Sequence, residues 1–213
     1  MHAQKNVLTL SLLSSEDIKA HLPAILSYLT EEERARASRY AREEDRLMSA
    51  GGAYLIRRNL GRDAIIRRTD EGKPYAEDHV RFNLSHSCGL VAAVFGGKNE
   101  IGVDVEKIRD GFDDLRTHVL TQPELDSGLD FFTLFTAKES LSKAAGTGLL
   151  PSPKDFPALP PDGKIPFRGK TYYRHALTFD GYRISVCQEH TDFILQKEFC
   201  HEPTERDPSA ESL

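Results

Sequence analysis

Residues Ile101-Gly102-Val103-Asp104-Val105-Glu106 alternate between apolar and other side chains, which is the pattern of a β-strand with two different faces. Because successive side chains of a strand point to opposite sides, Asp104 and Glu106 share one face while Val103 and Val105 pack on the other. The two carboxylates then lie about 7 Å apart, a spacing at which they can share a hard divalent cation. The alternative is a half-exposed edge strand whose acidic side chains only face water.

On both sides of this strand the chain offers helices followed by strands. Before it we predict a strand over 7–13, helices over 16–28, 30–40 and 43–60, a Gly-Lys-Pro turn over 72–74, and strands over 80–84 and 90–95 that flank a polar corner at 85–87. After it we predict helices over 113–120 and 130–145, a proline-rich segment over 151–166, and strands over 172–177, 182–188 and 193–199. This order predicts an α+β fold with antiparallel sheet. We expect one half over 1–102, a second over 103–200 and a loose tail over 201–213.

The composition is that of an ordinary globular chain, with 39% hydrophobic and 29% charged residues among 213. The formal charge of −5 argues against a general nucleic-acid binder. Between Arg34 and Arg68, however, ten arginines meet only four acidic residues. This basic stretch either receives a phosphorylated ligand or an acidic partner, or it is a solvated helix face. With three scattered cysteines and no long apolar run, we expect a cytoplasmic protein away from the membrane.

A second stretch with candidate functional residues is Phe135-Thr136-Ala137-Lys138-Glu139-Ser140-Leu141-Ser142-Lys143. On a helix, Glu139 and Lys143 are one turn apart and lie on the same face. An isolated pair of this kind is more often a weak surface ion pair than a site. A third stretch, Asn83-Leu84-Ser85-His86-Ser87, places hydrogen-bond donors for a phosphate at a strand end. A Ser–His hydrolase and a structural histidine in a turn are its alternatives, although the serine lacks the nucleophile-elbow pattern.

In combination these stretches are far more specific. Four motifs follow one another in this order: Gly-Lys-Pro (72–74), Phe-Asn-Leu-Ser-His-Ser (82–87), Gly-Val-Asp-Val-Glu (102–106) and Phe-Thr-Ala-Lys-Glu-Ser-x-x-Lys (135–143), which contains Lys-Glu-x-x-x-Lys (138–143). The order resembles the 4′-phosphopantetheinyl transferase superfamily, and within it the two-halved surfactin-synthetase-activating type, over about residues 30–150. The resemblance implies a pseudo-twofold pair of α+β halves, each a small, mainly antiparallel sheet packed against helices, with coenzyme A held in the cleft between them.

The resemblance also implies roles for individual residues. Asp104, Glu106 and Glu139 match the magnesium ligands of the family, and Glu139 and Lys143 are the expected catalytic residues. Lys138 and Lys143 match lysines that face the pyrophosphate, and Ser85 and His86 match residues around the coenzyme A phosphates. Two further matches complete the expected coenzyme A site. Arg68, Lys73 and Pro74 match a turn that borders the adenine, and Arg36 and Ser49 match contacts to the 3′-phosphate. Glu33 stands where some members carry a lysine.

The implied reaction moves the 4′-phosphopantetheine moiety of coenzyme A to a serine hydroxyl of an apo acyl or peptidyl carrier protein and releases adenosine 3′,5′-bisphosphate. It implies Mg²⁺, with Mn²⁺ as a substitute, and coenzyme A as co-substrate. We expect a monomer that binds no nucleic acid. Two other functions use the same residues: a carrier- or coenzyme A-binding module without turnover, and a magnesium-dependent phosphohydrolase that releases free phosphopantetheine.

Overall fold

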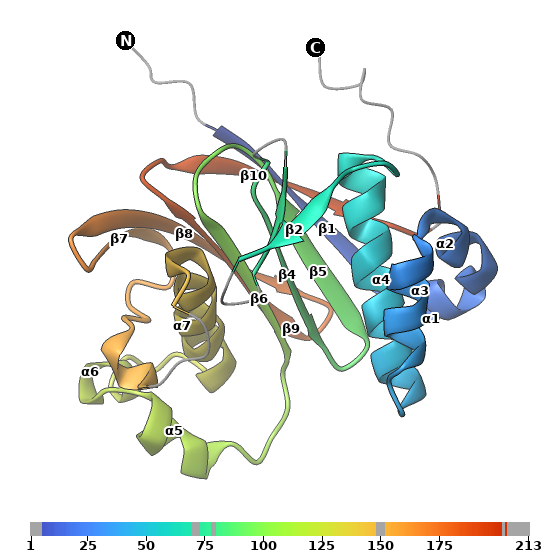
Figure 1. The fold of residues 1–213 in the computed structure, drawn as a ribbon. Helices are drawn as coiled ribbons and strands as arrows, with labels where there is room; N and C mark the ends of the chain where they lie inside the picture. Colours follow the sequence, from blue (N-terminus) through green and yellow to red (C-terminus); the bar gives the residue numbers. More distant parts are fainter. Residues whose placement is uncertain (1–5, 70–72, 78–79, 148–151, 202, 204–213) are drawn as a thin grey trace.

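A computed structural model of the chain describes residues 6–69, 73–77, 80–147, 152–201 and 203. In these residues the strands form two four-stranded sheets and one separate two-stranded sheet (Figure 1). The first four-stranded sheet has the order β10 (Phe193–Phe199), β1 (Asn6–Ser14), β5 (Leu90–Phe95) and β4 (Phe82–Ser87). The second has the order β6 (Ile101–Lys107), β9 (Tyr182–Glu189), β8 (Lys170–Phe179) and β7 (Gly163–Phe167). The two-stranded sheet is a hairpin of β2 (Ile66–Arg68) and β3 (Pro74–Ala76).

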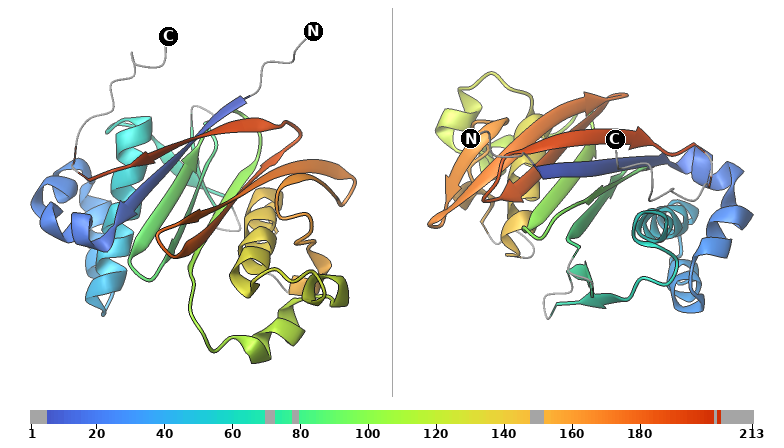
Figure 2. Two further views of the ribbon diagram at one scale, coloured as in Figure 1. Left: turned by 180° about the vertical axis from the view of Figure 1, so that it is seen from behind. Right: turned by 90° about the horizontal axis from the view of Figure 1, so that it is seen from above.

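Helices cover the outer face of each four-stranded sheet. The first sheet carries α1 (Ser15–Ala20), α2 (Leu22–Tyr28), α3 (Glu31–Ser38) and α4 (Glu43–Leu60), and α4 lies between the sheet and the other three (Figure 2). The second sheet carries α7 (Phe131–Ala145), with α5 (Asp113–Val119), α6 (Gln122–Leu125) and the short 3₁₀ turn Pro153–Asp155 nearby. The predicted α+β class is therefore confirmed. None of the helices in the described ranges is both long enough and apolar enough to cross a bilayer.

The strand alternation explains how the layers stack. Leu8, Leu10 and Leu12 of β1 share one apolar core with Val103 and Val105 of β6, so the inner faces of the two sheets pack on each other. The opposite faces point to the helices: the first sheet and α1–α4 enclose a second core, and the second sheet packs on α7. The other face of β6, which carries the predicted acidic pair, therefore looks toward α7.

At the junction of the sheets, β4 and β6 run alongside each other in the same direction. Their contact is made by side chains, because the Asn83 side-chain oxygen accepts a hydrogen bond from the backbone amide of Val103 at 2.9 Å. Both groups are buried, and this bond satisfies an amide at the edge of the second sheet. The junction brings the Ser85–Ser87 stretch of β4 next to the acidic face of β6.

Three local predictions need correction. The helix predicted over 16–28 is two helices, because Pro23 lies in the first turn of α2 and has no amide with which to continue α1. The predicted corner at 85–87 is strand, and the turn falls one step later at Cys88 and Gly89, which both have positive φ as in a type I′ hairpin. The proline-rich segment contains a strand, β7, which pairs with β8 at the edge of the second sheet.

The last strand does not stay with the second sheet. β10 pairs in parallel with β1, so residues Phe193–Phe199 extend the first sheet although they lie at the far end of the chain. The division of the chain at residue 102 into two halves remains a prediction. Of the tail predicted over 201–213, only residues 201 and 203 belong to the described part of the chain.

Candidate active site

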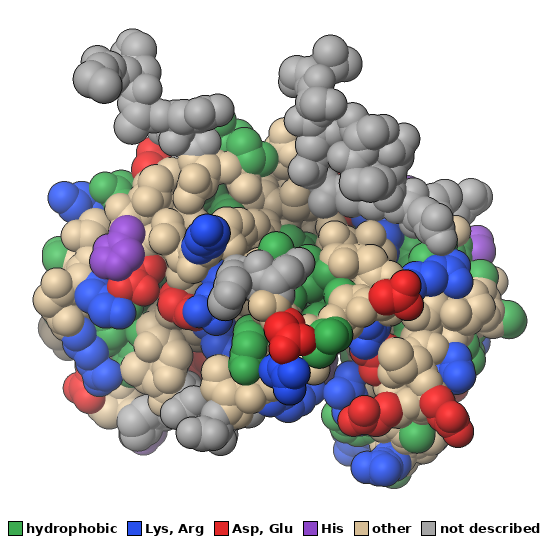
Figure 3. All heavy atoms as spheres, turned by 45° about the horizontal axis from the view of Figure 1, so that its top comes forward, with side chains coloured by type: hydrophobic (Ala, Val, Ile, Leu, Met, Phe, Trp, Pro, Cys, Tyr) green, Lys and Arg blue, Asp and Glu red, His purple; other side chains and the backbone are tan. Residues whose placement is uncertain are grey.

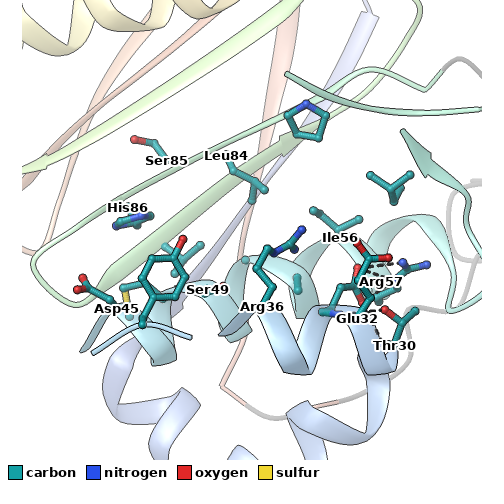
Figure 4. A pocket seen from close by; sticks show the side chains of 18 of the residues that line it. Thr30, Glu32, Arg36, Asp45, Ser49, Ile56, Arg57, Leu84, Ser85 and His86 are labelled. Carbon is teal, nitrogen blue, oxygen red and sulfur yellow. Dashed lines mark hydrogen bonds and ion pairs between the residues drawn. The ribbon is translucent and has the colours of Figure 1, made fainter. Parts of the chain in front are cut away.

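A cavity of about 530 Å³ opens between α3, α4, β4 and the β2–β3 hairpin (Figure 4). In the space-filling view a hollow separates the lobe of N-terminal helices from the centre of the molecule, with Lys and Arg side chains at its rim (Figure 3). Most of the residues predicted to contact coenzyme A line this cavity: Arg36, Ser49, Arg68, Pro74, Ser85 and His86. The structure thus brings together groups that come from four separate elements.

Arg36 is one of the cations that line the cavity. It follows the first turn of α3, which begins with a capping box in which Thr30 and Glu33 exchange hydrogen bonds of 3.0 and 3.2 Å. From there the Arg36 side chain extends into the middle of the cavity (Figure 4). Within the described residues its guanidinium has no hydrogen bond or ion pair, and it is half-buried. A half-buried cation without a protein partner is suited to an anionic ligand.

Glu33 has a structural role at this end of the cavity. Its carboxylate accepts three hydrogen bonds from the guanidinium of Arg57, the shortest at 2.9 Å, and both side chains are buried. Burial by itself would raise the pKa of Glu33, but the bonds from Arg57 and Thr30 outweigh it and lower the pKa below its usual value. The buried pair holds α3 against α4, which explains an acidic residue at this position.

Several other arginines of the basic stretch bind groups of the protein itself. Some of them donate to backbone carbonyls at helix ends and others pair with carboxylates: Arg34 with Leu26 and Leu29, Arg46 with Tyr40 and Ala41, Arg58 with Glu198, and Arg67 with Glu77. Of the ten, only Arg36, Arg57 and Arg68 line the cavity. The excess of positive charge therefore contributes to the site through a few members only.

Gly102, the second residue of β6, lies where no side chain fits. A Cβ at this position would lie 2.2 Å from the backbone oxygen of Ser140 and 2.6 Å from the amide of Ala144. Both atoms belong to α7, so any other residue would push the helix away from β6. The close contact brings the helix that carries Glu139 and Lys143 next to Asp104.

Two serines of β4 match the two carboxylates of β6. Ser85 Oγ donates to Asp104 Oδ1 at 2.9 Å, and Ser87 Oγ donates to Glu106 Oε2 at 2.7 Å. Both pairs are nineteen positions apart in the sequence because the two strands run in the same direction. Ser87 was absent from the predicted site. The sequence signal for it was the spacing of two residues between Ser85 and Ser87, which equals the spacing between Asp104 and Glu106.

Lys143 joins the same cluster from α7. Its ammonium donates to Asp104 Oδ1 at 2.7 Å, to the carbonyl oxygen of Val103 at 3.0 Å and to Ser85 Oγ at 3.1 Å. Asp104 Oδ1 therefore has two donors. By contrast, Asp104 Oδ2 is buried and has no hydrogen-bond partner among the described residues.

Glu139 and Glu106 are electrostatically coupled to Asp104. Burial raises the pKa of Glu139 above its usual value, and the negative charges of Asp104 and Glu106 raise it further, against the opposing effect of Lys143. Burial also raises the pKa of Glu106; the hydrogen bond from Ser87 opposes this and the charge of Asp104 adds to it. The predicted triad therefore lies in one neighbourhood where the carboxylates repel one another.

These residues fit a hard divalent cation in chemistry. Mg²⁺ takes oxygen ligands, and Asp104 Oδ2 is a buried carboxylate oxygen that lacks a donor. A cation would also relieve the repulsion among the three acids. Within the described residues, no three His, Cys, Asp or Glu side chains already converge closely enough to hold an ion. Joint binding would need the three carboxylates to move closer together.

Lys138 does not reach the cavity, which corrects its predicted contact with the pyrophosphate. Its side chain is 0% exposed and points to the other side of α7. The ammonium donates to Glu124 Oε1 at 2.8 Å and to the carbonyl oxygen of Phe156 at 2.6 Å. Glu124 Oε1 also accepts from the amide of Ala158 at 2.8 Å. Lys138 is thus a buried link between α7, α6 and the segment 156–158.

Lys73 is also engaged outside the cavity wall, although its neighbours Arg68 and Pro74 line the cavity. Its ammonium donates to Glu100 Oε2 at 2.7 Å and to the carbonyl oxygen of Lys143 at 2.9 Å. The predicted turn at 72–74 is described only from residue 73 onward.

Comparison with known proteins gives a consistent result. Residues 100–187 match the 4′-phosphopantetheinyl transferase superfamily, and this range contains Asp104, Glu106, Glu139 and Lys143. The chain is 27% identical over 192 residues to the 4′-phosphopantetheinyl transferase Sfp of Bacillus subtilis (strain 168), covering 79% of this chain and 85% of the relative. It is 29% identical over 150 residues to the 4′-phosphopantetheinyl transferase gsp of Aneurinibacillus migulanus, covering 62% of this chain and 63% of the relative. It is also 29% identical over 154 residues to the 4′-phosphopantetheinyl transferase HetI of Nostoc sp. (strain PCC 7120 / SAG 25.82 / UTEX 2576), covering 62% and 65%.

Proposed function

We propose that the chain is a 4′-phosphopantetheinyl transferase, as its similarity to that superfamily suggests. It transfers the 4′-phosphopantetheine moiety of coenzyme A to a serine hydroxyl of an apo carrier protein, with adenosine 3′,5′-bisphosphate as the second product. One observation carries the proposal. Ser85 lines the cavity and donates a hydrogen bond to Asp104, so the acidic cluster adjoins the space that Arg36 and His86 also line. A nucleotide bound beside Arg36 would therefore extend its pyrophosphate toward the carboxylates.

We assign the phosphate contacts to the cavity residues. Arg36 is the proposed partner of the 3′-phosphate, together with Ser49 on α4. His86 is exposed on β4 and would donate to the pyrophosphate, and Ser85 lies one residue closer to Asp104. Arg68 and Pro74 form the hairpin side of the cavity, where we place the adenine. These contacts set the position of the ligand, which is most of what phosphoryl-type transfer asks of a protein.

Asp104, Glu106 and Glu139 are the proposed ligands of Mg²⁺, for which Mn²⁺ is a substitute. When bound, the metal neutralises pyrophosphate charge and polarises the phosphorus for attack. Asp104 would contribute Oδ2, since Oδ1 is already saturated by Ser85 and Lys143.

The proton of the attacking serine goes to a carboxylate in this proposal. Glu139 is the proposed base, because it is a carboxylate of the acidic cluster and can accept a proton there. In the metal-free protein, burial and two neighbouring carboxylates raise its pKa. Lys143, one helical turn further along α7, stabilises the oxygen of the leaving 5′-phosphate as negative charge develops there. To do so, its ammonium turns away from Asp104, which it contacts in the free protein.

One chain supplies every wall of the cavity described above, and we propose that the protein acts as a monomer. The cysteines Cys88, Cys187 and Cys200 are free thiols, which suits the reducing cytoplasm where we place the reaction.

The experiment is a mass-shift assay with an apo acyl or peptidyl carrier protein, coenzyme A and Mg²⁺. The wild-type protein should add one phosphopantetheine per carrier. Asp104→Asn and Glu139→Gln should each lower the rate by at least about 100-fold, and the exposed control Asp126→Asn should not. Wild-type rates for either site variant would refute the assignment of these residues. Coenzyme A binding without carrier modification would indicate a binding module, and free phosphopantetheine without carrier would indicate a hydrolase.

A further inference from the structure

The β2–β3 hairpin forms one wall of the cavity but belongs to neither four-stranded sheet. In the described residues β2 pairs only with β3, over three residue pairs. A hairpin of this size is not stable by itself in water, so other contacts must hold its position. That position matters, because Ile66, Arg68 and Pro74 are the residues it contributes to the cavity.

One end of the hairpin is anchored by apolar packing. Ala76 is 2% exposed and belongs to the core under the first sheet, and Ile66 packs against the same core. At the other end, Arg68 pairs with Pro74 in the strand register, and the amide of Thr69 donates to the carbonyl oxygen of Lys73. None of the described residues at this end belongs to an apolar core.

Lys73 supplies the second anchor. Its ammonium has three acceptors on the other side of the molecule: Glu100 Oε2 at 2.7 Å, the carbonyl oxygen of Lys143 at 2.9 Å and that of Ile101 at 3.3 Å. The side chain is only 18% exposed, so water competes weakly for these bonds. The Lys143 carbonyl lies in the last turn of α7, where it also accepts a 3.3 Å hydrogen bond from the amide of Gly146, and the C-terminal end of a helix attracts cations.

The anchor therefore reaches the residue that also touches the acidic cluster. Lys143 accepts a hydrogen bond from Lys73 through its backbone and donates one to Asp104 through its side chain. Lys143 therefore connects the hairpin wall of the cavity to the acidic cluster through hydrogen bonds.

We propose that Lys73 is a positioning residue: it ties the β2–β3 hairpin to Glu100 and to the end of α7, and so holds Arg68 and Pro74 in place for the nucleotide. The inference rests on the proposed function for the identity of the nucleotide, and it removes Lys73 from the groups that touch coenzyme A. Without these hydrogen bonds of Lys73, the hairpin samples positions that do not fit the nucleotide. The affinity for the nucleotide then falls in proportion to the fraction of molecules whose hairpin is in the binding position.

A double-mutant cycle separates a tie from direct contact. The ligand is adenosine 3′,5′-bisphosphate, and its Kd is measured by calorimetry for the wild type, Lys73→Met, Glu100→Gln and the double variant. If Lys73 acts through Glu100, both single variants weaken binding and the double variant is no weaker than Lys73→Met. Lys73→Arg, which can reach the same acceptors, should bind more tightly than Lys73→Met. The control Glu77→Gln breaks the exposed Arg67–Glu77 pair on the same hairpin and should leave Kd unchanged.

Three results would overturn the tie: an effect of Lys73→Met with none of Glu100→Gln, effects that multiply in the double variant, or no effect of either. A second measurement needs no ligand. Hydrogen exchange at the amides of Thr69 and Glu77, which close the hairpin, should accelerate in Lys73→Met and Glu100→Gln but not in Glu77→Gln. If the wild type binds neither the bisphosphate nor coenzyme A, the proposed function fails, whereas unchanged exchange rates would reject the tie itself.

Discussion

The ammonium of Lys143 lies 2.7 Å from Oδ1 of Asp104, the contact that connects α7 to the acidic strand β6. Asp104 is 5% exposed, so this pair lies in an environment where water screens charge poorly. In the free protein Lys143 thus compensates the charge of the carboxylate. In the proposed reaction the same ammonium would stabilise the leaving phosphate, and a cation held by the acidic cluster would compensate the charge of Asp104 instead.

Lys143→Met tests this double role. It should lower kcat by about 100- to 1,000-fold, the usual effect of losing one donor to a developing anion, while the Kd for coenzyme A changes much less. Single-turnover transfer to an apo carrier protein and calorimetric binding give the two quantities. Lys164→Met, an exposed lysine on β7, is the matched control. An unchanged kcat would rule out the leaving-group role.

Arg36→Ala tests the proposed contact to the 3′-phosphate. A hydrogen bond to a charged group contributes about 1.5–3 kcal/mol, so coenzyme A should bind about 10- to 100-fold more weakly. Dephospho-coenzyme A lacks the 3′-phosphate and should bind the variant and the wild type alike. Arg39→Ala, an exposed arginine at the end of the same helix, should affect neither ligand. Equal losses for both ligands would place Arg36 elsewhere on the nucleotide.

Lys138→Met should act on stability and leave ligand affinity unchanged. Removing the ammonium leaves Glu124 buried without its charged partner, which typically lowers the free energy of unfolding by about 3–5 kcal/mol. Urea unfolding measures this loss. Calorimetry with coenzyme A below the unfolding transition should give the wild-type Kd. A Kd that weakens while the unfolding free energy stays constant would restore Lys138 to the pyrophosphate site.

The same buried pair predicts a pH dependence of stability. Burial alone would raise the pKa of Glu124, but hydrogen bonds from Lys138 and from the amides of Thr121 and Ala158 lower it below its usual value. Its contribution to the unfolding free energy is therefore complete above the unfolded pKa, about 4.3, and is lost as the pH falls through the lower folded value. Urea unfolding from pH 6 down to the acid transition, an interval of about 3 units, should show a smaller loss for Glu124→Gln than for the wild type. Parallel curves for the two proteins would contradict this assignment.

The sequence by itself determined most of the elements and the resemblance to a family. Alternation fixed the strands around 101–106, 182–188 and 193–199, and the Thr30 capping box fixed the start of α3, because these signals depend on neighbouring residues only. Periodicity alone did not predict the break before α2, because Pro23 causes it. Nor did it predict strand β7, because that strand depends on pairing with β8.

Tertiary structure decided which polar residues lie at the cavity and which support the fold. Lys138 and Lys143 come from one helix and look equivalent in sequence, yet one is enclosed with Glu124 and the other reaches Asp104. Likewise, Arg36 enters the cavity while Arg57 is held by Glu33. The position of such a side chain depends on partners that folding brings near from distant parts of the chain. Coulomb and hydrogen-bond energies depend on distance and burial, and the order of residues alone gives neither.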